Sequence, residues 1–502
     1  MSGEATGELS ESRYIAIDLG AESGRVIAGT LRDGRVALEE LHRFPNIPVR
    51  TPDGLHWDIL RLFHEILTGL RAAAERYLDI AGIGVDSWAV DYGLLDERGR
   101  LLGNPYHYRD ARTDGVREAA AALVPASEQY ARTGIAQLPF NTIYQLLAQR
   151  RDADHSLDRA AALLLIPDLL HYWLCGVKAT EYTNATTTGA LGVDGRWAAD
   201  ILERLAVPSG MLLSPAPPGT MLAPVRDEVR AETDLGQVPV LLPATHDTAC
   251  AVAAVPAAGA ASHAYISSGT WSLLGLELDR PIMGEAARLA GFTNEGGVGG
   301  TYRFLKNIMG LWIIQECRRA WSRVGHDLSY EDLTARAAAS DSPGAIIDVD
   351  DPSFLHPDDM PRALGAHLRR TGQAVPDEPV RLVRAVLDSL ALKYRFALEQ
   401  AEALSGRHVE VVHMVGGGSR NALLCQLTAD VCARPVLAGP AEGTALGNIL
   451  VQAMATGEVA RLGEVHAIAR TSSDVLEYEP RPGARQDEAY ERLRDIIKTG
   501  RE

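Results

Sequence analysis

Cysteine is scarce in this 502-residue chain, which contains only five, at positions 175, 250, 317, 425 and 432. No two of them form a Cys-X-X-Cys pair. An odd number of widely spaced cysteines in a long chain favours reduced thiols that serve in packing, as in proteins of the cytoplasm. The sequence therefore predicts a cytoplasmic protein without disulfides.

Long apolar runs are missing as well. No stretch approaches the roughly 18 consecutive apolar residues that a membrane span requires. Residues 1–12 are polar and acidic, and they lack the basic and then apolar layout of a signal peptide. These two absences argue against a membrane partner and again favour the cytoplasm.

Basic residues are fewer than acidic ones. The chain has 49 Lys and Arg residues and 66 Asp and Glu residues, which gives a formal net charge of -17. An acidic surface disfavours nonspecific binding to nucleic acid or to anionic membranes. It does not exclude phosphate ligands, because backbone N–H groups and Mg²⁺ can bind phosphates locally. The charge thus argues against a polynucleotide partner and says almost nothing about ATP.

The order of predicted elements indicates an α/β fold in two similar halves. Residues 14–19, 25–31 and 35–44 are predicted strands, with an Asp-Gly hairpin signal at 33–34, and a helix follows at 56–77. Three strands before the first helix do not fit a dinucleotide-binding unit, which alternates strand and helix from its start. Further strands are expected at 80–85 and 90–95. A similar block of elements follows residue 245.

The length and the 46% of hydrophobic residues suffice for two domains. We expect them at 13–245 and 246–480, separated near the Pro-rich segment 214–224 or in the segment that follows it to Pro243, with a charged terminal helix at 481–502. The second half has predicted strands at 300–304, 409–415 and 435–438, and predicted helices at 308–321, 380–404, 421–432 and 443–455. The sequence leaves the oligomeric state, monomer or dimer, open.

Two short segments could bind phosphate groups. The segment DLGAESGR at 18–25 begins with a carboxylate at a strand end, which can hold Mg²⁺, and its small residues let backbone N–H groups approach phosphates. It is not a Walker A motif. The segment SSGTWS at 267–272 opens the second half as DLGAESGR opens the first. Each could be a plain hairpin, but their matching positions favour a nucleotide clamped across a cleft.

A third glycine-rich segment, VGGGSRN at 415–421, lies between a predicted strand and a predicted helix. Such a turn lets a nucleotide approach the backbone and the helix N-terminus. A lone triple glycine is weak support. Here it is the third candidate element in a consistent order.

Two further segments suit the acceptor of a phosphoryl group. In THDT at 245–248, Asp247 follows a predicted strand and could accept a hydroxyl proton, although a helix N-cap is an equally ordinary use of aspartate. In DSWAVDYG at 86–93, two carboxylates and two aromatic residues beside a strand end could bind a sugar. The alternative is a hairpin with exposed acids.

Taken together, these segments resemble the FGGY carbohydrate kinases of the actin/Hsp70-like ATPase superfamily. The resemblance spans residues 14–479 and includes specific segments: HRFPN at 42–46, YRDART at 108–113, LPFNTIYQL at 138–146, EYTNATTT at 181–188, SSGTWSLLG at 267–275, TNEGG at 293–297 and LKNIMGLW at 305–312. It implies two ribonuclease H-like domains flanking a deep cleft, and ATP-dependent phosphorylation of L-rhamnulose at the O1 hydroxyl in L-rhamnose catabolism.

The resemblance also implies roles for individual residues. Asp247 would be the general base, and Asp18 would help to hold Mg²⁺. The residues expected to contact the sugar are Asp86, Ala89, Asp91, His246, Asp247, Thr248 and Asn307. The residues expected to contact ATP are Ala21, Glu22, Ser23, Gly24, Arg25, Thr270, Gln315 and Gly417.

One residue departs from the family pattern, and it keeps a related substrate open. Ala89 stands where the sugar-facing motif commonly has glycine, and its methyl group could narrow the pocket. The alternatives are a kinase of L-fuculose, L-ribulose, L-xylulose or glycerol. Another is a chaperone-like or filament-forming ATPase, which the polar residues on the sugar side argue against. A silent sugar sensor is disfavoured by Asp247.

Overall fold

The computed structural model describes residues 11–152, 155–257, 262–481, 483 and 486–500, and the chain forms two compact units. The first unit takes in the described residues up to Pro256 together with residues 295–302 and 443–473. The second unit takes in the described residues of 257–294, of 303–442 and from Asp474 onward. Each unit combines segments that are far apart in the sequence, so the expected domain limits at residues 245 and 480 stay a prediction.

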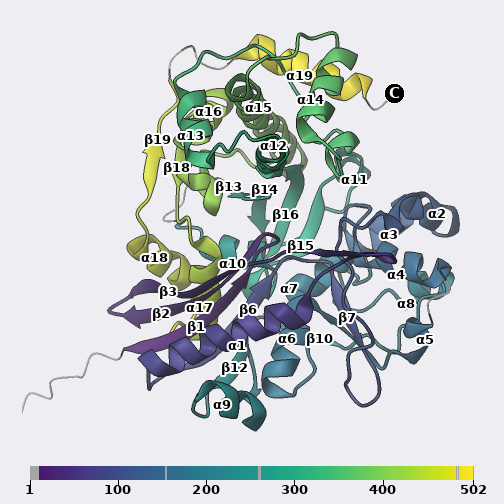
Figure 1. Ribbon diagram of the computed structural model, residues 1–502, viewed down its shortest axis with the longest axis vertical. Coiled ribbons are helices and arrows are strands. Elements are labelled where there is room, and N and C mark those ends of the chain that lie inside the picture. The colour runs from purple at the N-terminus through teal and green to yellow at the C-terminus, as the bar shows by residue number, and fades with distance from the viewer. Residues whose placement is uncertain (1–10, 153–154, 258–261, 482, 484–485, 501–502) are drawn as a thin grey trace, which may run out of the picture. The chain divides into compact units, whose positions relative to one another are not determined.

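The first unit is built on a six-stranded sheet in the order β11-β12-β6-β1-β2-β3 (Figure 1). Strands β6 and β12 run parallel to β1, whereas β1, β2 and β3 form an antiparallel meander. Its elements are β1 (Ser12–Leu19), β2 (Ser23–Arg32), β3 (Arg35–Pro45), β4 (Val49–Thr51), β5 (Gly54–His56), α1 (Ile59–Arg76), β6 (Gly82–Ser87), β7 (Tyr92–Leu95), α2 (Val116–Leu123), α3 (Ala126–Thr133), α4 (Thr142–Arg151), α5 (Ser156–Arg159), β8 (Ala162–Leu165), α6 (Ile166–Cys175), β9 (Thr180–Glu181), α7 (Tyr182–Ala185), α8 (Ala199–Arg204), β10 (Pro215–Ala216), β11 (Thr220–Pro224), α9 (Asp227–Thr233), β12 (Pro239–Leu242), α10 (Asp247–Ala253), α17 (Gly443–Ala455) and α18 (Leu462–Ser472).

Helices from distant parts of the chain cover the two faces of this sheet. Helix α1 packs on the face that carries Val26, and α17 packs on the face that carries Gly29. Helices α10 and α17 approach so closely that a Cβ atom at Gly447 would collide with the backbone of Cys250. Because only glycine permits this approach, the pair of helices fixes the start of α10 relative to the sheet.

The second unit is built on a seven-stranded sheet in the order β15-β16-β14-β13-β17-β18-β19, of which β15 begins in this unit and continues into the first. The long helix α15 packs against α13, α16, α19 and β14. The elements are β13 (His263–Ser268), β14 (Trp271–Leu278), α11 (Glu285–Ala290), β15 (Thr293–Gly296), β16 (Tyr302–Met309), α12 (Trp312–Arg323), α13 (Tyr330–Ala338), α14 (Met360–Arg370), α15 (Pro379–Ser405), β17 (Val411–Val415), α16 (Ala422–Cys432), β18 (Val436–Ala438), β19 (Leu476–Tyr478) and α19 (Asp487–Thr499).

The two units share one strand order. The series β3-β2-β1-β6-β12 in the first unit corresponds to β16-β14-β13-β17-β18 in the second. In both units an antiparallel hairpin comes first, and two strands then run parallel to its first strand. The predicted α/β class with two similar, sheet-bearing parts is therefore confirmed.

Most predicted elements are present, with shifted ends. The expected helix at 308–321 begins at Trp312, because Ile308 and Met309 still belong to β16, which is longer than the strand expected at 300–304. The strand expected from residue 90 begins at Tyr92, because Val90 has a φ of 68°. The terminal helix α19 is charged on its exposed side and packs on α15.

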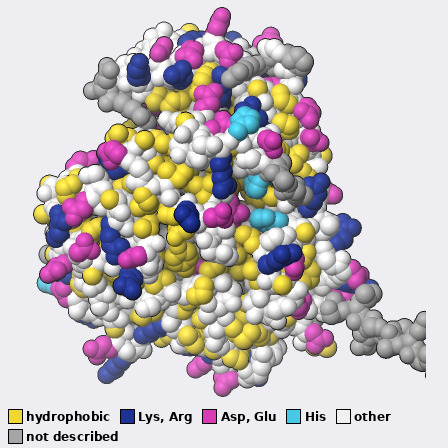
Figure 2. Space-filling model, turned by 180° about the vertical axis from the view of Figure 1, so that it is seen from behind, with side chains coloured by type: hydrophobic (Ala, Val, Ile, Leu, Met, Phe, Trp, Pro, Cys, Tyr) yellow, Lys and Arg dark blue, Asp and Glu magenta, His cyan; other side chains and the backbone are white. Residues whose placement is uncertain are grey.

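The structure shows where the few cysteines lie, whether any helix is long and apolar, and how the charged side chains are distributed. All five cysteines are buried and none is in a disulfide. No helix within the described part of the chain has both the length and the apolar character needed to cross a membrane. On the face shown in Figure 2, basic side chains lie interspersed with acidic ones. The expectation about residues 1–12 falls mostly outside the described residues.

Candidate active site

Three acidic residues gather at one edge of the first sheet. The parallel register of β1 and β6 pairs Asp18 with Asp86. One residue further along, Ser87 forms a parallel bridge with His246, and its N–H donates to the carbonyl of Thr245 at 2.9 Å. Parallel strands end at the same edge of a sheet, so Asp247, next after His246, joins the other two acids there.

Asp86 is the most deeply buried of the three and is fully inaccessible to solvent. Its Oδ2 accepts a hydrogen bond of 2.6 Å from Nδ2 of Asn448 on α17, while its Oδ1 has no hydrogen-bond partner among the described residues. Burial and the negative charge of Asp18 raise the pKa of Asp86 well above its usual range. A buried carboxylate oxygen without a donor points to a ligand that is bound during function.

Asp18 forms an ion pair with Arg25, its direct partner across the β1–β2 hairpin. The hairpin itself is closed by a 2.9 Å hydrogen bond from Gly20 N to Ser23 O. Asn46 supports it, because its Nδ2 donates to Gly20 O and its N–H donates to Glu22 O, both at 2.9 Å. The structure thus brings the predicted phosphate-binding segment 21–25 next to Asp18.

The three carboxylates suit a hard divalent cation such as Mg²⁺. Such a cation prefers oxygen ligands and usually keeps several waters, so one or two carboxylates suffice when substrate phosphates supply the rest. Within the described residues, no group of three or more His, Cys, Asp or Glu side chains forms a complete metal site. The free Oδ1 of Asp86 and the neighbouring Asp18 fit a partial, carboxylate-only ligand set.

Asp247 is the first residue of α10, and its side chain is 32% exposed. Its Oδ1 accepts hydrogen bonds from N (2.5 Å) and Oγ1 (3.2 Å) of Thr248, while its Oδ2 makes no contact with a donor among the described residues. His246 lies between two acids, with Nε2 3.3 Å from Oδ1 of Asp247 and Nδ1 3.4 Å from Oε2 of Glu295. These contacts fix Asp247 by one oxygen and leave the other available.

The loop before Asp247 is held by Glu181, a fully buried carboxylate. Its Oε2 accepts hydrogen bonds from N (3.1 Å) and Oγ1 (2.9 Å) of Thr245, and also from Oγ1 of Thr183 and N of Asn184. Its Oε1 accepts from N of Thr183 at 2.8 Å. Hydrogen bonds to a charged acceptor are about twice as strong as neutral ones, so this carboxylate fixes the approach to Asp247.

Asp91 lies on the side where the sugar was expected, but its hydrogen bonds are internal. Its Oδ2 accepts from Nε1 of Trp57 (2.6 Å), from Nε1 of Trp88 (3.0 Å) and from N of Tyr108 (3.1 Å), and its Oδ1 accepts from Nε2 of Gln145 (2.8 Å). Burial raises the pKa of Asp91 to about 6, although these donors oppose the shift. Asp91 is thus an anchor for two indole rings, and its expected contact with a sugar stays a prediction.

The turn between Trp88 and Asp91 is strained. Val90 has a φ of 68°, which is a true outlier for a β-branched residue. The N–H of Asp91 donates to the carbonyl of Ala89 at 2.9 Å, which closes a tight turn, and Oγ1 of Thr142 donates to the carbonyl of Val90 at 2.6 Å. Such strain is retained where the surroundings determine the backbone, often beside a ligand. Ala89, the first residue of this turn, is therefore held in one position.

In the second unit, the glycine-rich segment packs against the hairpin 267–272. A Cβ atom at Gly418 would collide with the side chain of Ser268, and one at Gly416 would lie 3.0 Å from its carbonyl oxygen. A Cβ atom at Gly417 would meet nothing within 4 Å. Two of the three glycines therefore serve this close packing, and Gly417 leaves open space where a ligand can approach.

The expected nucleotide residues Thr270 and Gln315 lie on either side of one junction. The carbonyl of Thr270 accepts from the N–H groups of Gly310 and Trp312, both at 3.2 Å, so the hairpin 267–272 is joined to the start of α12. Gln315, in the second turn of α12, has a buried Oε1 without a hydrogen-bond partner among the described residues. Asn307 lies on β16 and is half-buried.

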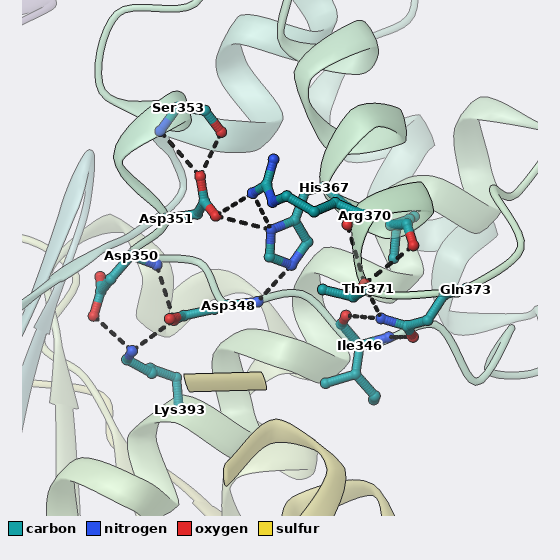
Figure 3. A network of polar contacts seen from close by, with 11 residues as sticks. Ile346, Asp348, Asp350, Asp351, Ser353, His367, Arg370, Thr371, Gln373 and Lys393 are labelled. Carbon is teal, nitrogen blue, oxygen red and sulfur yellow. Dashed lines mark hydrogen bonds and ion pairs between the residues drawn. The ribbon is translucent and has the colours of Figure 1, made fainter. Parts of the chain in front are cut away.

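A partly buried polar network, shown in Figure 3, is joined to the end of β16 next to this junction. Nζ of Lys393 lies 2.7 Å from Oδ1 of Asp348 and 2.9 Å from Oδ2 of Asp350. Oδ1 of Asp350 accepts from the N–H of Met309 at 2.9 Å, at the end of β16. His367 continues the network, with Nε2 3.3 Å from the N–H of Asp348 and Nδ1 3.0 Å from Oδ2 of Asp351. The network fixes the strand that leads into α12.

Sequence reasoning did not assign roles to several residues that build the site. Glu181 and Glu295 lie in segments that carry the family resemblance, EYTNATTT and TNEGG, and that was the only signal for them. Asn448 lies 362 residues after Asp86, and Trp57 lies in the turn before α1. Nothing local in the sequence links these residues to the carboxylates, because the links arise from tertiary packing.

Comparisons with known proteins agree with this arrangement. The model of the N-terminal domain of the FGGY family of carbohydrate kinases matches residues 13–254, and the model of the C-terminal domain of the same family matches residues 264–456. The chain therefore belongs to the FGGY family of carbohydrate kinases, and it is a carbohydrate kinase.

Within this family the chain is similar to proteins named rhamnulokinase. It is 41% identical over 489 residues to the rhamnulokinase of Bacteroides thetaiotaomicron, and the aligned region covers 97% of this chain and 100% of that protein. It is 43% identical over 479 residues to the rhamnulokinase of Pectobacterium carotovorum, and the aligned region covers 94% of each chain. These similarities extend over nearly the full length and include both units.

Solved structures of other sugar and polyol kinases share the fold. The gluconate kinase of Lactobacillus acidophilus superposes with a TM-score of 0.79 at 16% identity, over 98% of both chains. The glycerol kinase of Plasmodium falciparum, solved with ADP, superposes with a TM-score of 0.74 at 15% identity, over 97% of this chain and 98% of that one. At this low identity the likeness concerns the fold alone.

Proposed function

We propose that this chain transfers the γ-phosphoryl group of ATP to the O1 hydroxyl of L-rhamnulose, with Asp247 as the general base. The observation that carries the proposal is the carboxylate of Asp247, held through Oδ1 and free at Oδ2, at the sheet edge that also carries Asp18 and Asp86. The relatives named rhamnulokinase supply the substrate.

The proposed roles follow from the contacts. Oδ2 of Asp247 accepts the O1 proton as the sugar oxygen attacks, and His246 and Thr248 keep the carboxylate in place. Asp18 and Asp86 would hold Mg²⁺, which when bound neutralises charge on the transferring phosphoryl group. The proposed sugar contacts are Ala89, His246 and Thr248 in the first unit and Asn307 in the second. The proposed nucleotide contacts are the segment 21–25 in the first unit and Thr270, Gln315 and Gly417 in the second.

The pH dependence of kcat/KM for L-rhamnulose tests this proposal. Burial raises the pKa of Asp247, and the negative charge of Asp18 adds to the shift, although His246 opposes it. The base acts only when deprotonated, so activity falls as the pH drops through this raised value. We expect the acidic limb of the profile, followed by ADP release at saturating ATP, to lie clearly above about pH 4, where an ordinary aspartate titrates.

A profile that stays flat down to the ordinary range of a carboxylate would contradict the assignment of Asp247 as the base. A control titration of the coupling enzymes over the same pH range separates their own losses from those of the kinase.

A further inference from the structure

A cavity of about 480 Å³ lies in the first unit, apart from the carboxylate edge. It is lined by the β4–β5 hairpin, by residues 102–106 and by the strand and helix that begin at Tyr92 and Thr142, and it is partly open to solvent. Its volume is that of a small-metabolite site. None of the residues Asp18, Asp86 and Asp247 lines it.

Arg112 lines this cavity, and two of its guanidinium nitrogen atoms make no hydrogen bond to the described residues. Its Nη2 donates to Oε1 of Gln145 at 2.8 Å, and its guanidinium lies 3.9 Å above the ring of Tyr106. Its Nε and Nη1 are buried and contact no acceptor among the described residues. A buried cationic donor without an acceptor is costly, and the natural partner of a guanidinium is a carboxylate or a phosphate.

His56, on another wall of the cavity, is also incompletely paired. Its side chain is 11% exposed, and its Nδ1 lies 3.4 Å from the carbonyl of Asn104. Its Nε2 is buried without a hydrogen bond and lies 3.6 Å from a carboxylate oxygen of Asp53, which is 71% exposed. When Nδ1 donates to the carbonyl, Nε2 becomes an acceptor for a hydroxyl group.

We propose that this cavity is a second ligand site, which binds a small polyhydroxylated anion, a sugar phosphate or a sugar acid, with its anionic group on Arg112. The cation and the unpaired donors select the anionic group. Around it, His56, Asn104, Thr51 and Ser156 supply partners for hydroxyl groups, and the ring of Tyr106 supplies an apolar face. Asp53 and Asp58 also line the cavity, where their carboxylates accept from Oγ1 of Thr51 and N of Arg61, and within the described residues Nε and Nη1 of Arg112 bond neither of them.

A ligand bound to Arg112 would affect the strained turn at residues 89–91. Arg112 donates to Gln145, Gln145 donates to Oδ1 of Asp91, and Asp91 accepts from the indole of Trp88. Ala89 follows Trp88 directly. The chain of three hydrogen bonds therefore couples the cavity to the wall that faces the proposed sugar position, and occupancy of the cavity would alter the surroundings of Trp57 and Trp88.

Titration calorimetry on the full-length protein tests the site with three probes: glucose 6-phosphate, D-gluconate and the neutral polyol sorbitol. We expect one of the anions to bind with a Kd below about 1 mM, and sorbitol to show no saturable binding. Binding of the phosphate alone or of the carboxylate alone identifies the anionic group. Intrinsic tryptophan fluorescence should change with the same midpoint. The test needs no turnover, so its outcome does not depend on the proposed function.

A matched pair of variants locates the binding. Gly103 lines the cavity, and a Cβ atom there meets nothing within 4 Å, so Gly103→Phe fills the space without backbone strain. Gly236 offers the same freedom outside the cavity, which makes Gly236→Phe the control. We expect Gly103→Phe to weaken anion binding at least about tenfold, and Gly236→Phe to leave it unchanged. Undetectable binding of both anions up to about 10 mM, or equal binding to both variants, overturns the proposal.

Discussion

Replacement of Asp247 with asparagine is expected to lower kcat for L-rhamnulose by about 10²- to 10⁴-fold, the usual contribution of a positioned general base. The amide keeps the size of the side chain and can still accept from Thr248 through its oxygen, so α10 keeps its start. It cannot accept a proton from the sugar. The measurement is steady-state ADP release with saturating ATP and sugar.

Nucleotide binding separates this loss from misfolding. Asp247 makes hydrogen bonds to Thr248 and to none of the proposed nucleotide residues, so Asp247→Asn should bind ADP with a Kd within about twofold of the wild-type value. Asp377→Asn, at a site that is 82% exposed, is the matched control and should leave kcat unchanged. Near-normal turnover of Asp247→Asn would show that another group accepts the proton.

Replacement of Glu181 with glutamine should also reduce kcat, by about 10- to 100-fold, through the position of Asp247. One carboxylate oxygen becomes an NH₂ group, which must face at least one of the donors that now point at Glu181. The loop at Thr245 then loses its fixed position. Because Glu181 touches the loop and not the proposed nucleotide residues, KM for ATP should stay within about twofold of wild type.

Three further variants separate a positioning role from general loss of stability. Glu228→Gln, on the exposed side of α9, is the matched control and should have no effect. Thr245→Ser keeps the hydroxyl that donates to Glu181, whereas Thr245→Val removes it, so only the valine variant should follow Glu181→Gln. A parallel fall of kcat and of ADP binding in Glu181→Gln would indicate a purely structural role.

The helices and strands that position the site were largely predictable from the sequence, because local sequence patterns determine them. The strand at residues 14–19, the Asp-Gly turn at 33–34 and the strand before Thr245 all have their predicted structure. The two phosphate-binding candidates lie in corresponding hairpins, β1–β2 and β13–β14. Hairpins and strand ends depend on residues that are close in sequence, which is why pattern and turn chemistry suffice.

The contacts of the site that could not be predicted from the sequence depend on packing between residues far apart in the chain. The pairing of Asp18 with Asp86 follows from the parallel register of β1 and β6, which are separated in the sequence by strands β2 to β5 and helix α1. The anchor of Asp86 comes from Asn448, on a helix near the end of the chain that packs in the first unit. The strand end at Met309 is held by Asp350, which moves the start of α12 to Trp312.

Asp91 shows why residue type alone is a weak guide to a role. A carboxylate between two aromatic residues suggested a sugar ligand, yet three side-chain donors and one backbone donor already bind it. Its partners Trp57 and Tyr108 lie elsewhere in the sequence. Ala89, in contrast, lies in the strained turn that these anchors hold, and its expected contact with the sugar stays a prediction.

The proposed activity is tested most directly by ADP release from the wild-type protein with ATP, Mg²⁺ and a panel of L-rhamnulose, L-fuculose, L-ribulose, L-xylulose and glycerol. We expect L-rhamnulose to give the highest kcat/KM and its product to carry the phosphoryl group on O1. A higher kcat/KM for another member of the panel, or ADP release that no member stimulates, would contradict the proposed activity.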